Sequence, residues 1–187
     1  MNLKKTAIFV VVLGLGLLAL TGQSCSKSHD STPAMMTLYD TLGGTTMVND
    51  PAHSGTNIEK GRLGLRTVVD SAIFIIAADN KINGYFKVLL NEVGMGNLSG
   101  FQTLSKNLTD FLCVATGAKN FTYGGKNMKD AHNPTGNSRM TGTVNSADFD
   151  QFVVDVAASA KKNGLSDPII ARVGALLNTL KTTVVQR

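Results

Sequence analysis

The sequence predicts an all-α domain, and three observations support this class. Apolar residues recur with the 3.6-residue period of a helix over several separate stretches. No stretch alternates apolar and polar residues as a half-buried strand would, and no internal repeat is visible. The 187 residues include 43% hydrophobic ones, while 19 glycines and four prolines separate short helices. These figures suit one domain with a single apolar core.

The N-terminal segment predicts export. Lys4 and Lys5 precede an apolar run from Ala7 to Leu20, which is the pattern of a secretory signal. The run is shorter than the roughly 20 residues that a membrane-spanning helix needs. We therefore divide the chain into a signal peptide over residues 1–24, a polar tether over 25–36 and a helical domain over 37–187.

Cys25 follows small residues at the end of this signal. The pattern resembles a bacterial lipoprotein signal, in which such a cysteine is acylated and becomes the new N-terminus. Gly22 departs from the pattern, because these signals usually carry leucine there. The alternative is an ordinary signal cut near Ser24, which leaves a free thiol. We expect an exported, lipid-anchored envelope protein, in the periplasm or outer membrane, whose only membrane contact is the anchor at Cys25.

Charge and cysteine content argue against several classes of protein. The net charge of +5 includes two lysines of the signal, and the other basic residues are scattered. Because nucleic-acid-binding domains carry a basic stripe or patch, we expect no nucleic-acid partner. Cys113 lies in an apolar run and is interpreted as a buried thiol. The sequence has no Cys-x-x-Cys-His motif for covalent haem, and no paired cysteines or His-Glu-x-x-His motif for zinc.

The domain begins with a short amphipathic helix over residues 35–44. It ends at a glycine pair, since glycine adopts the left-handed conformation that closes a helix. The polar stretch 45–60 is expected to be a loop that contains His53. A longer helix then runs to Asp79. Its apolar residues share one face, namely Leu65, Val68, Val69, Ala72, Ile73 and Ile76.

Two aromatics, Tyr85 and Phe86, form a corner after this helix, and a turn is expected over 91–97. The next helix lies within 98–115 and ends before Gly117. One face of it is apolar and consists of Phe101, Leu104, Leu108, Phe111, Leu112 and Ala115.

A Tyr-Gly-Gly turn and a short polar segment then lead to His132, which is followed by a loop over 133–142. Asn145 stands three residues before Asp148 and predicts the start of a helix over 149–160. Pro168 opens the last apolar run, which reaches Val184. A lone histidine between apolar helices serves either as an axial ligand of a haem iron or as a structural residue.

Several of these segments, in this order, resemble the group I truncated haemoglobins, and the resemblance reaches from Leu38 to the C-terminus. The blocks that carry it are Leu38–Gly44, Val68–Asp70, Ala78–Asp79, Tyr85–Phe86, Phe111–Gly117, Tyr123–Gly124 and Met128–His132.

The resemblance implies a two-over-two helical sandwich around a pocket for non-covalent haem b. It implies that His132 is the proximal iron ligand, that Phe86 packs on the porphyrin and that Met128 lies beside it. On the distal side it places Ile73, Phe101, Leu104 and Leu108.

The sequence departs from the family at three places. The stretch 45–64 and the loop 133–143 are longer than the family's connections. Ile73 stands where a distal tyrosine is usual, and Leu104 and Leu108 stand where glutamine is common. The usual polar network over oxygen is therefore missing, which argues against oxygen-dependent nitric oxide detoxification.

Four functions follow from these residues. The favoured one is a globin that binds a diatomic gas (O2, NO or CO). The second is a nitric oxide dioxygenase or peroxidase-like enzyme, served by a reductase. The third is an electron-transfer protein in which His53 closes the sixth iron position. The fourth is a lipoprotein of globin fold that has lost haem and acts as an interaction module.

Overall fold

The computed structural model describes residues 36–187. The signal, Cys25 and all of the tether except Met36 lie outside the described residues. The elements in chain order are α1 (Leu38–Thr41), β1 (Met47–Asn49), β2 (Asn57–Glu59), α2 (Lys60–Ala78), the 3-10 helix η1 (Asn83–Phe86), α3 (Lys87–Gly94), α4 (Ser99–Ala115), α5 (Met128–Ala131), α6 (Ser146–Lys162), α7 (Asp167–Asn178) and α8 (Lys181–Val184).

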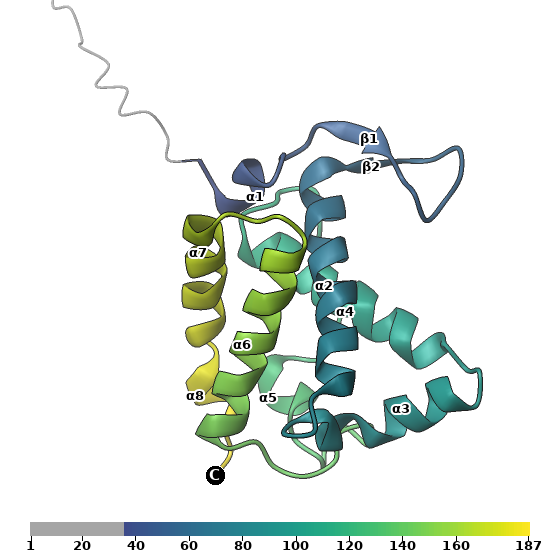
Figure 1. Ribbon diagram of the computed structural model, residues 1–187, viewed down its shortest axis with the longest axis vertical. Helices are drawn as coiled ribbons and strands as arrows, with labels where there is room; N and C mark the ends of the chain where they lie inside the picture. The colour runs from purple at the N-terminus through teal and green to yellow at the C-terminus, as the bar shows by residue number, and fades with distance from the viewer. Residues whose placement is uncertain (1–35) are drawn as a thin grey trace, which may run out of the picture. The chain divides into compact units, whose positions relative to one another are not determined.

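Four long helices form two layers. Helix α2 packs against α4 in one layer, α6 packs against α7 in the other, and α2 also contacts α6 (Figure 1). The core between them is apolar and is built from Leu65, Val69, Ala72, Ile73, Leu112, Cys113, Val156, Val173 and Leu177. The predicted all-α class and the two-over-two arrangement are confirmed.

Local sequence explains where the helices begin and end. Asn145 and Asp148 form the predicted capping box of α6, with side chains and backbone amides bonded reciprocally. Pro168 lies in the first turn of α7, where its missing N–H costs no hydrogen bond. Gly117 follows α4 with a φ of 103°, a conformation that favours glycine. Cys113 is fully buried, as expected, and burial raises the pKa of its thiol to about 11.

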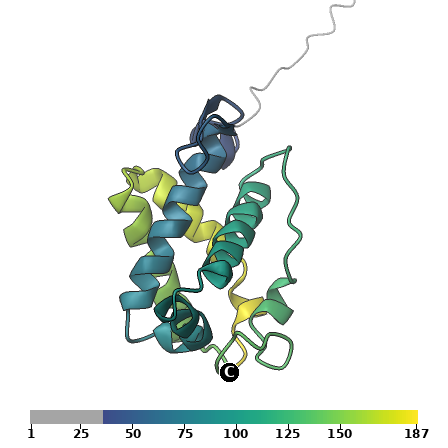
Figure 2. The same ribbon diagram turned by 90° about the vertical axis from the view of Figure 1, so that its right-hand side faces the viewer.

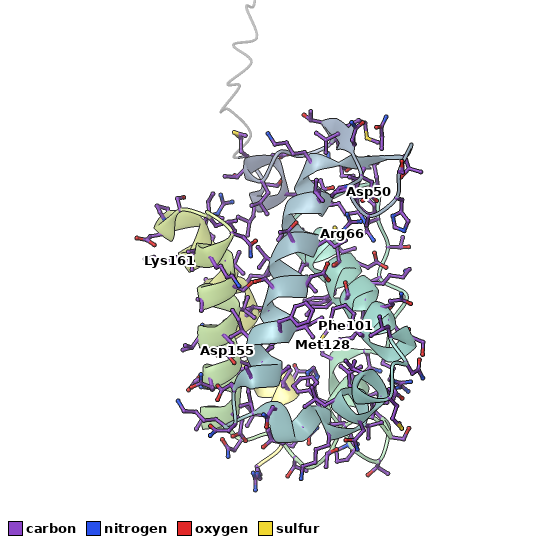
Figure 3. All side chains as sticks on the ribbon, turned by 45° about the vertical axis from the view of Figure 1, so that its right-hand side comes forward. Asp50, Arg66, Phe101, Met128, Asp155 and Lys161 are labelled. Atoms are coloured by element: carbon purple, nitrogen blue, oxygen red, sulfur yellow. The ribbon has the colours of Figure 1, made fainter. Side chains whose placement is uncertain are left out.

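The stretch 45–60, which the sequence predicts as a loop, contains a small antiparallel hairpin. Val48 of β1 pairs with Ile58 of β2. Asp50, in the turn, accepts two hydrogen bonds from Arg66 of α2, at 3.1 and 2.5 Å, and these fix the hairpin to the helix (Figure 3). The loop prediction was wrong because strands of three residues are too short to show alternation.

Two helical predictions also need correction. Residues 87–94 form α3, so the turn predicted over 91–97 begins only after Gly94. The final apolar run is divided into α7 and α8 at Thr179 and Leu180. There the backbone switches to three-residue spacing, since the amide of Leu180 donates to the carbonyl of Leu177 at 2.9 Å. In the part that the structure describes, no helix is both long and apolar enough to cross a membrane.

Two glycines of α2 predict opposite effects of substitution. Gly61 faces the ring of Tyr39, which is 1% exposed, and a Cβ there would lie 2.8 Å from Tyr39 Cζ. A Cβ at Gly64 would meet nothing nearer than 3.8 Å. We expect Gly61→Ala to lower the free energy of unfolding by about 1–3 kcal/mol through overpacking. Gly64→Ala should raise it by up to about 1 kcal/mol through helix propensity.

Urea unfolding of both variants checks this pair. Because the two substitutions are chemically identical and lie on one helix, their difference reports the space around each glycine. Equal effects at the two positions would contradict the packing described for Tyr39.

Asp155 of α6 predicts a dependence of stability on pH. Its side chain is 5% exposed, Oδ1 accepts a hydrogen bond from Gln151 at 3.1 Å, and Oδ2 has no partner among the described residues. Burial and the neighbouring carboxylate of Asp79 raise the pKa of Asp155 above its usual 3.8. The ionised form is therefore disfavoured by folding, and stability falls as pH rises from about 4 through the folded pKa.

We expect Asp155→Asn to raise the free energy of unfolding at pH 7 by about 1 kcal/mol, since the amide removes the buried charge. The gain should disappear below about pH 4, where the wild-type carboxyl is protonated in both states. Thermal unfolding at pH 3.5 and pH 7 measures it. Asp150→Asn on the same helix is the control, because the Asp150 side chain is 58% exposed and pairs with Lys181, so that its replacement should bring no gain in stability at pH 7. A loss of stability at pH 7 would mean that Asp155 is required as an ion.

Candidate functional site

Helix α4 carries an apolar stripe that the polypeptide covers only in part. The face toward α2 is buried and includes Ser105, Thr109, Leu112 and Cys113. The adjoining face is apolar but only half-buried, and it consists of Phe101, Leu104, Leu108 and Phe111. We call these four residues the α4 stripe. Half-covered apolar surface of this kind is typical of a wall that faces an apolar ligand.

The segment between α4 and α5 leads the chain to His132. Residues 116–127 run back alongside α4 to the single-turn helix α5 (Figure 2). Tyr123 in this segment packs edge-on against Phe111, with ring centroids 5.6 Å apart. Asn127 then starts α5, because its side chain accepts the amide of Asp130 at 2.9 Å. Helix α5 makes its main helix contact with α8.

His132 follows α5 directly and is half-buried. Its Nδ1 donates a hydrogen bond to the carbonyl of Met128 at 2.8 Å, which requires the proton to be on Nδ1. The Nε2 atom then carries the lone pair, and it has no partner within residues 36–187. Burial lowers the pKa of His132, so the ring is neutral at pH 7. A neutral, oriented imidazole with a free Nε2 is the usual form of a metal-ligating histidine.

The structure separates His53 from this site. His53 lies in the turn of the hairpin, and its Nδ1 is 2.9 Å from Asp50 Oδ2. Asp50 is in turn bound to Arg66, near the start of α2. In Figure 3 this end of α2 lies away from Phe101 and Met128. The described residues therefore give no support to His53 as a second iron ligand, and they contain no cluster of three metal-binding side chains.

The distal candidates lie on α2 and α4. Ile73 is buried in the core between these helices, whereas Leu104 and Leu108 belong to the α4 stripe. Sequence reasoning missed Phe74, which is 67% exposed and has its ring centroid 5.5 Å from that of Phe101. Phe74 does not belong to the buried apolar face of α2, so an argument from helical periodicity could not identify it. The distal candidates and Phe74 all have apolar side chains.

Tyr85 and Gln102 carry the polar side chains that could serve as distal donors if they turned toward the site. The Tyr85 hydroxyl donates to Asp148 of α6 at 2.5 Å, and burial together with this bond raises the pKa of Tyr85. Gln102 is exposed at the start of α4. Phe86 is half-buried at the end of η1, next to Tyr85. The structure thus brings Met128 of α5 close to His132, which follows this helix, and it brings three of the distal candidates together on α4. Their roles toward a ligand stay predictions.

Comparison with known proteins supports the fold. No family model matches the sequence, and no curated protein matches it either. Among solved structures, truncated haemoglobin from Tetrahymena pyriformis in its Fe(III) form superposes with a TM-score of 0.58 at 22% identity. The match covers 81% of this chain and all of that one. Two single-residue variants of the same protein, also in the Fe(III) form, match to the same extent. The chain therefore has the truncated globin fold.

Proposed function

We propose that this chain is a haem-binding globin that holds non-covalent haem b between α4 and α5 and binds a diatomic gas. The observation that carries the proposal is His132, a neutral, half-buried imidazole whose Nε2 is free. The half-covered α4 stripe adds an apolar wall, which suits the face of a porphyrin. The donor set and its surroundings therefore fit this group, and the named truncated haemoglobins provide the precedent on the same fold.

The chain's own residues would perform three tasks. The Met128 carbonyl keeps the proton on Nδ1, so that Nε2 of His132 would be free to hold the iron. The α4 stripe would exclude water and favour the binding of a ligand with an apolar face. Phe86 and Met128 would offer further apolar contact to the haem. When bound, the haem supplies an iron with a position open to a diatomic gas.

An absorption spectrum of the purified protein tests this function. We expect a Soret band after addition of haemin, and a shift of that band after reduction and exposure to CO. A low-spin ferrous spectrum without added ligand would instead support the electron-transfer alternative. A protein that shows no Soret band at equimolar haemin would contradict the proposal and favour the interaction module.

We also propose that Cys25 is lipidated and anchors the domain to the envelope. The support is the sequence pattern alone, namely a signal-like run, a cysteine among small residues and a polar tether. Mass spectrometry of the mature N-terminus tests it, with Cys25→Ser as the variant. An unmodified N-terminus, or equal membrane association of the variant, would contradict it.

A further inference from the structure

The loop after His132 is attached to the 3-10 helix η1 and to helix α3. We call residues 133–143 the strap. Arg139 of the strap places Nη1 2.5 Å from Glu92 Oε2 of α3, and we call this ion pair the clasp. The amide of Thr141 also donates to the carbonyl of Tyr85 in η1 at 3.2 Å. The strap therefore has both a side-chain and a backbone attachment to the η1–α3 segment.

The clasp packs against the backbone of Gly100. This glycine is buried in the first turn of α4, and a Cβ at this position would collide with Arg139 Nη1 and Glu92 Oε2. The clasp thus rests on the α4 backbone one residue before Phe101, where the α4 stripe begins. The ion pair can occupy this place because residue 100 has no side chain.

The clasp is accessible to water and therefore reversible. The side chains of Glu92 and Arg139 are 18% and 49% exposed, respectively. Within the described chain, neither carries a second ion pair. A partly exposed pair of this kind shifts an equilibrium only a few-fold and weakens in salt. The ion pair is therefore expected to break and re-form in solution rather than to fix the strap permanently.

We propose that Glu92 and Arg139 are positioning residues that fasten the strap, and that opening of the clasp sets the rate at which haem enters and leaves. The strap starts at the residue after His132, whereas the clasp ends on α3 and on the first turn of α4. The strap therefore connects the segment that carries His132 to helix α4, which carries the α4 stripe. The inference rests on the proposed haem function and concerns exchange of haem, not its ligation.

Hydrogen exchange of the Thr141 amide in the haem-free protein tests the clasp by itself. We expect Glu92→Gln and Arg139→Gln to speed this exchange about two- to fivefold. Gly100→Ala should do the same, because it displaces the pair without changing a charge. The charge-reversed double variant, Glu92→Arg with Arg139→Glu, should restore the wild-type rate. Lys161→Gln is the control, since its partner Asp167 is 82% exposed and lies outside the strap.

Transfer of haem from the loaded protein to excess haem-free myoglobin tests the link to the site. We expect transfer about two- to fivefold faster in the three single variants and wild-type transfer in the charge-reversed pair. The difference should become smaller near 1 M salt, where the screening length is about 3 Å. The absorption spectrum of each loaded variant should stay unchanged, since His132 is untouched.

The two experiments separate the possible failures. Unchanged Thr141 exchange in all variants would show that the clasp does not fasten the strap. Faster Thr141 exchange with unchanged haem transfer would overturn the role in haem exchange while leaving the haem function intact. A wild-type protein that takes up no haem would refute the proposed function first, and the role of the clasp in haem exchange with it.

Discussion

Replacement of His132 by alanine is expected to abolish stable haem binding. His132 supplies the oriented, neutral Nε2 of the proposed site, and no other histidine in residues 36–187 lies near it. Loss of groups that merely orient a metal ligand typically lowers affinity 10- to 100-fold, so loss of the ligand itself should cost more than about 100-fold. Haemin titration, followed at the Soret band, measures the change. Added imidazole should restore a weak five-coordinate spectrum.

His53→Ala is the matched control for this experiment. It removes the same ring from an exposed hairpin turn, and it should leave both the titration and the ferrous spectrum unchanged. Wild-type haem affinity in His132→Ala, with an unchanged ferrous spectrum, would remove His132 from the ligand role. An effect of His53→Ala equal to that of His132→Ala would instead support the two-ligand alternative.

The long helices could be predicted because their stability is encoded locally. The apolar face of α2 repeats at the helical period from Leu65 to Ile76, and the helix ends before Asp79, as the sequence indicates. The capping box of α6 is visible as Asn145 and Asp148 three residues apart. His132 was selected through the resemblance to the truncated haemoglobins, and its role as a ligand stays a prediction.

Other features depend on contacts between distant residues and left no local pattern. The hairpin is held by Arg66 and Asp50, which lie 16 residues apart and belong to different elements. The clasp joins residues 47 positions apart, one of them in a loop. Phe74 is an exposed aromatic whose meaning appears only when Phe101 is found beside it. For such features the sequence supplies the residues, whereas the fold decides which of them meet.

The apolar distal side predicts rapid oxygen release. Dioxygen bound to a haem carries partial negative charge on its outer atom, so a distal hydrogen-bond donor slows its release. CO is less polar, and such a donor stabilises it less. Ile73, Leu104 and Leu108 cannot donate, and neither can Phe74 or Phe101. The hydroxyl of Tyr85, considered earlier as a donor, is engaged with Asp148. We therefore expect a preference for CO or NO over oxygen, relative to globins with a distal tyrosine.

Ile73→Tyr is expected to slow oxygen release by roughly 10- to 150-fold, the kinetic equivalent of about 1.5–3 kcal/mol for a hydrogen bond to a charged acceptor. CO release should be nearly unchanged. Because Ile73 is buried, the larger ring should also lower stability by about 1–3 kcal/mol.

Ile73→Phe is the control. It introduces a ring of similar size without the hydroxyl, so the ratio of the Tyr to the Phe release rates isolates the hydrogen bond. Stopped-flow measurement of oxygen and CO dissociation gives both rates. Equal oxygen release from the two variants would mean that a hydroxyl at position 73 does not reach the ligand. Wild-type release already as slow as in tyrosine-bearing globins would mean that another donor exists and that the distal side is not apolar.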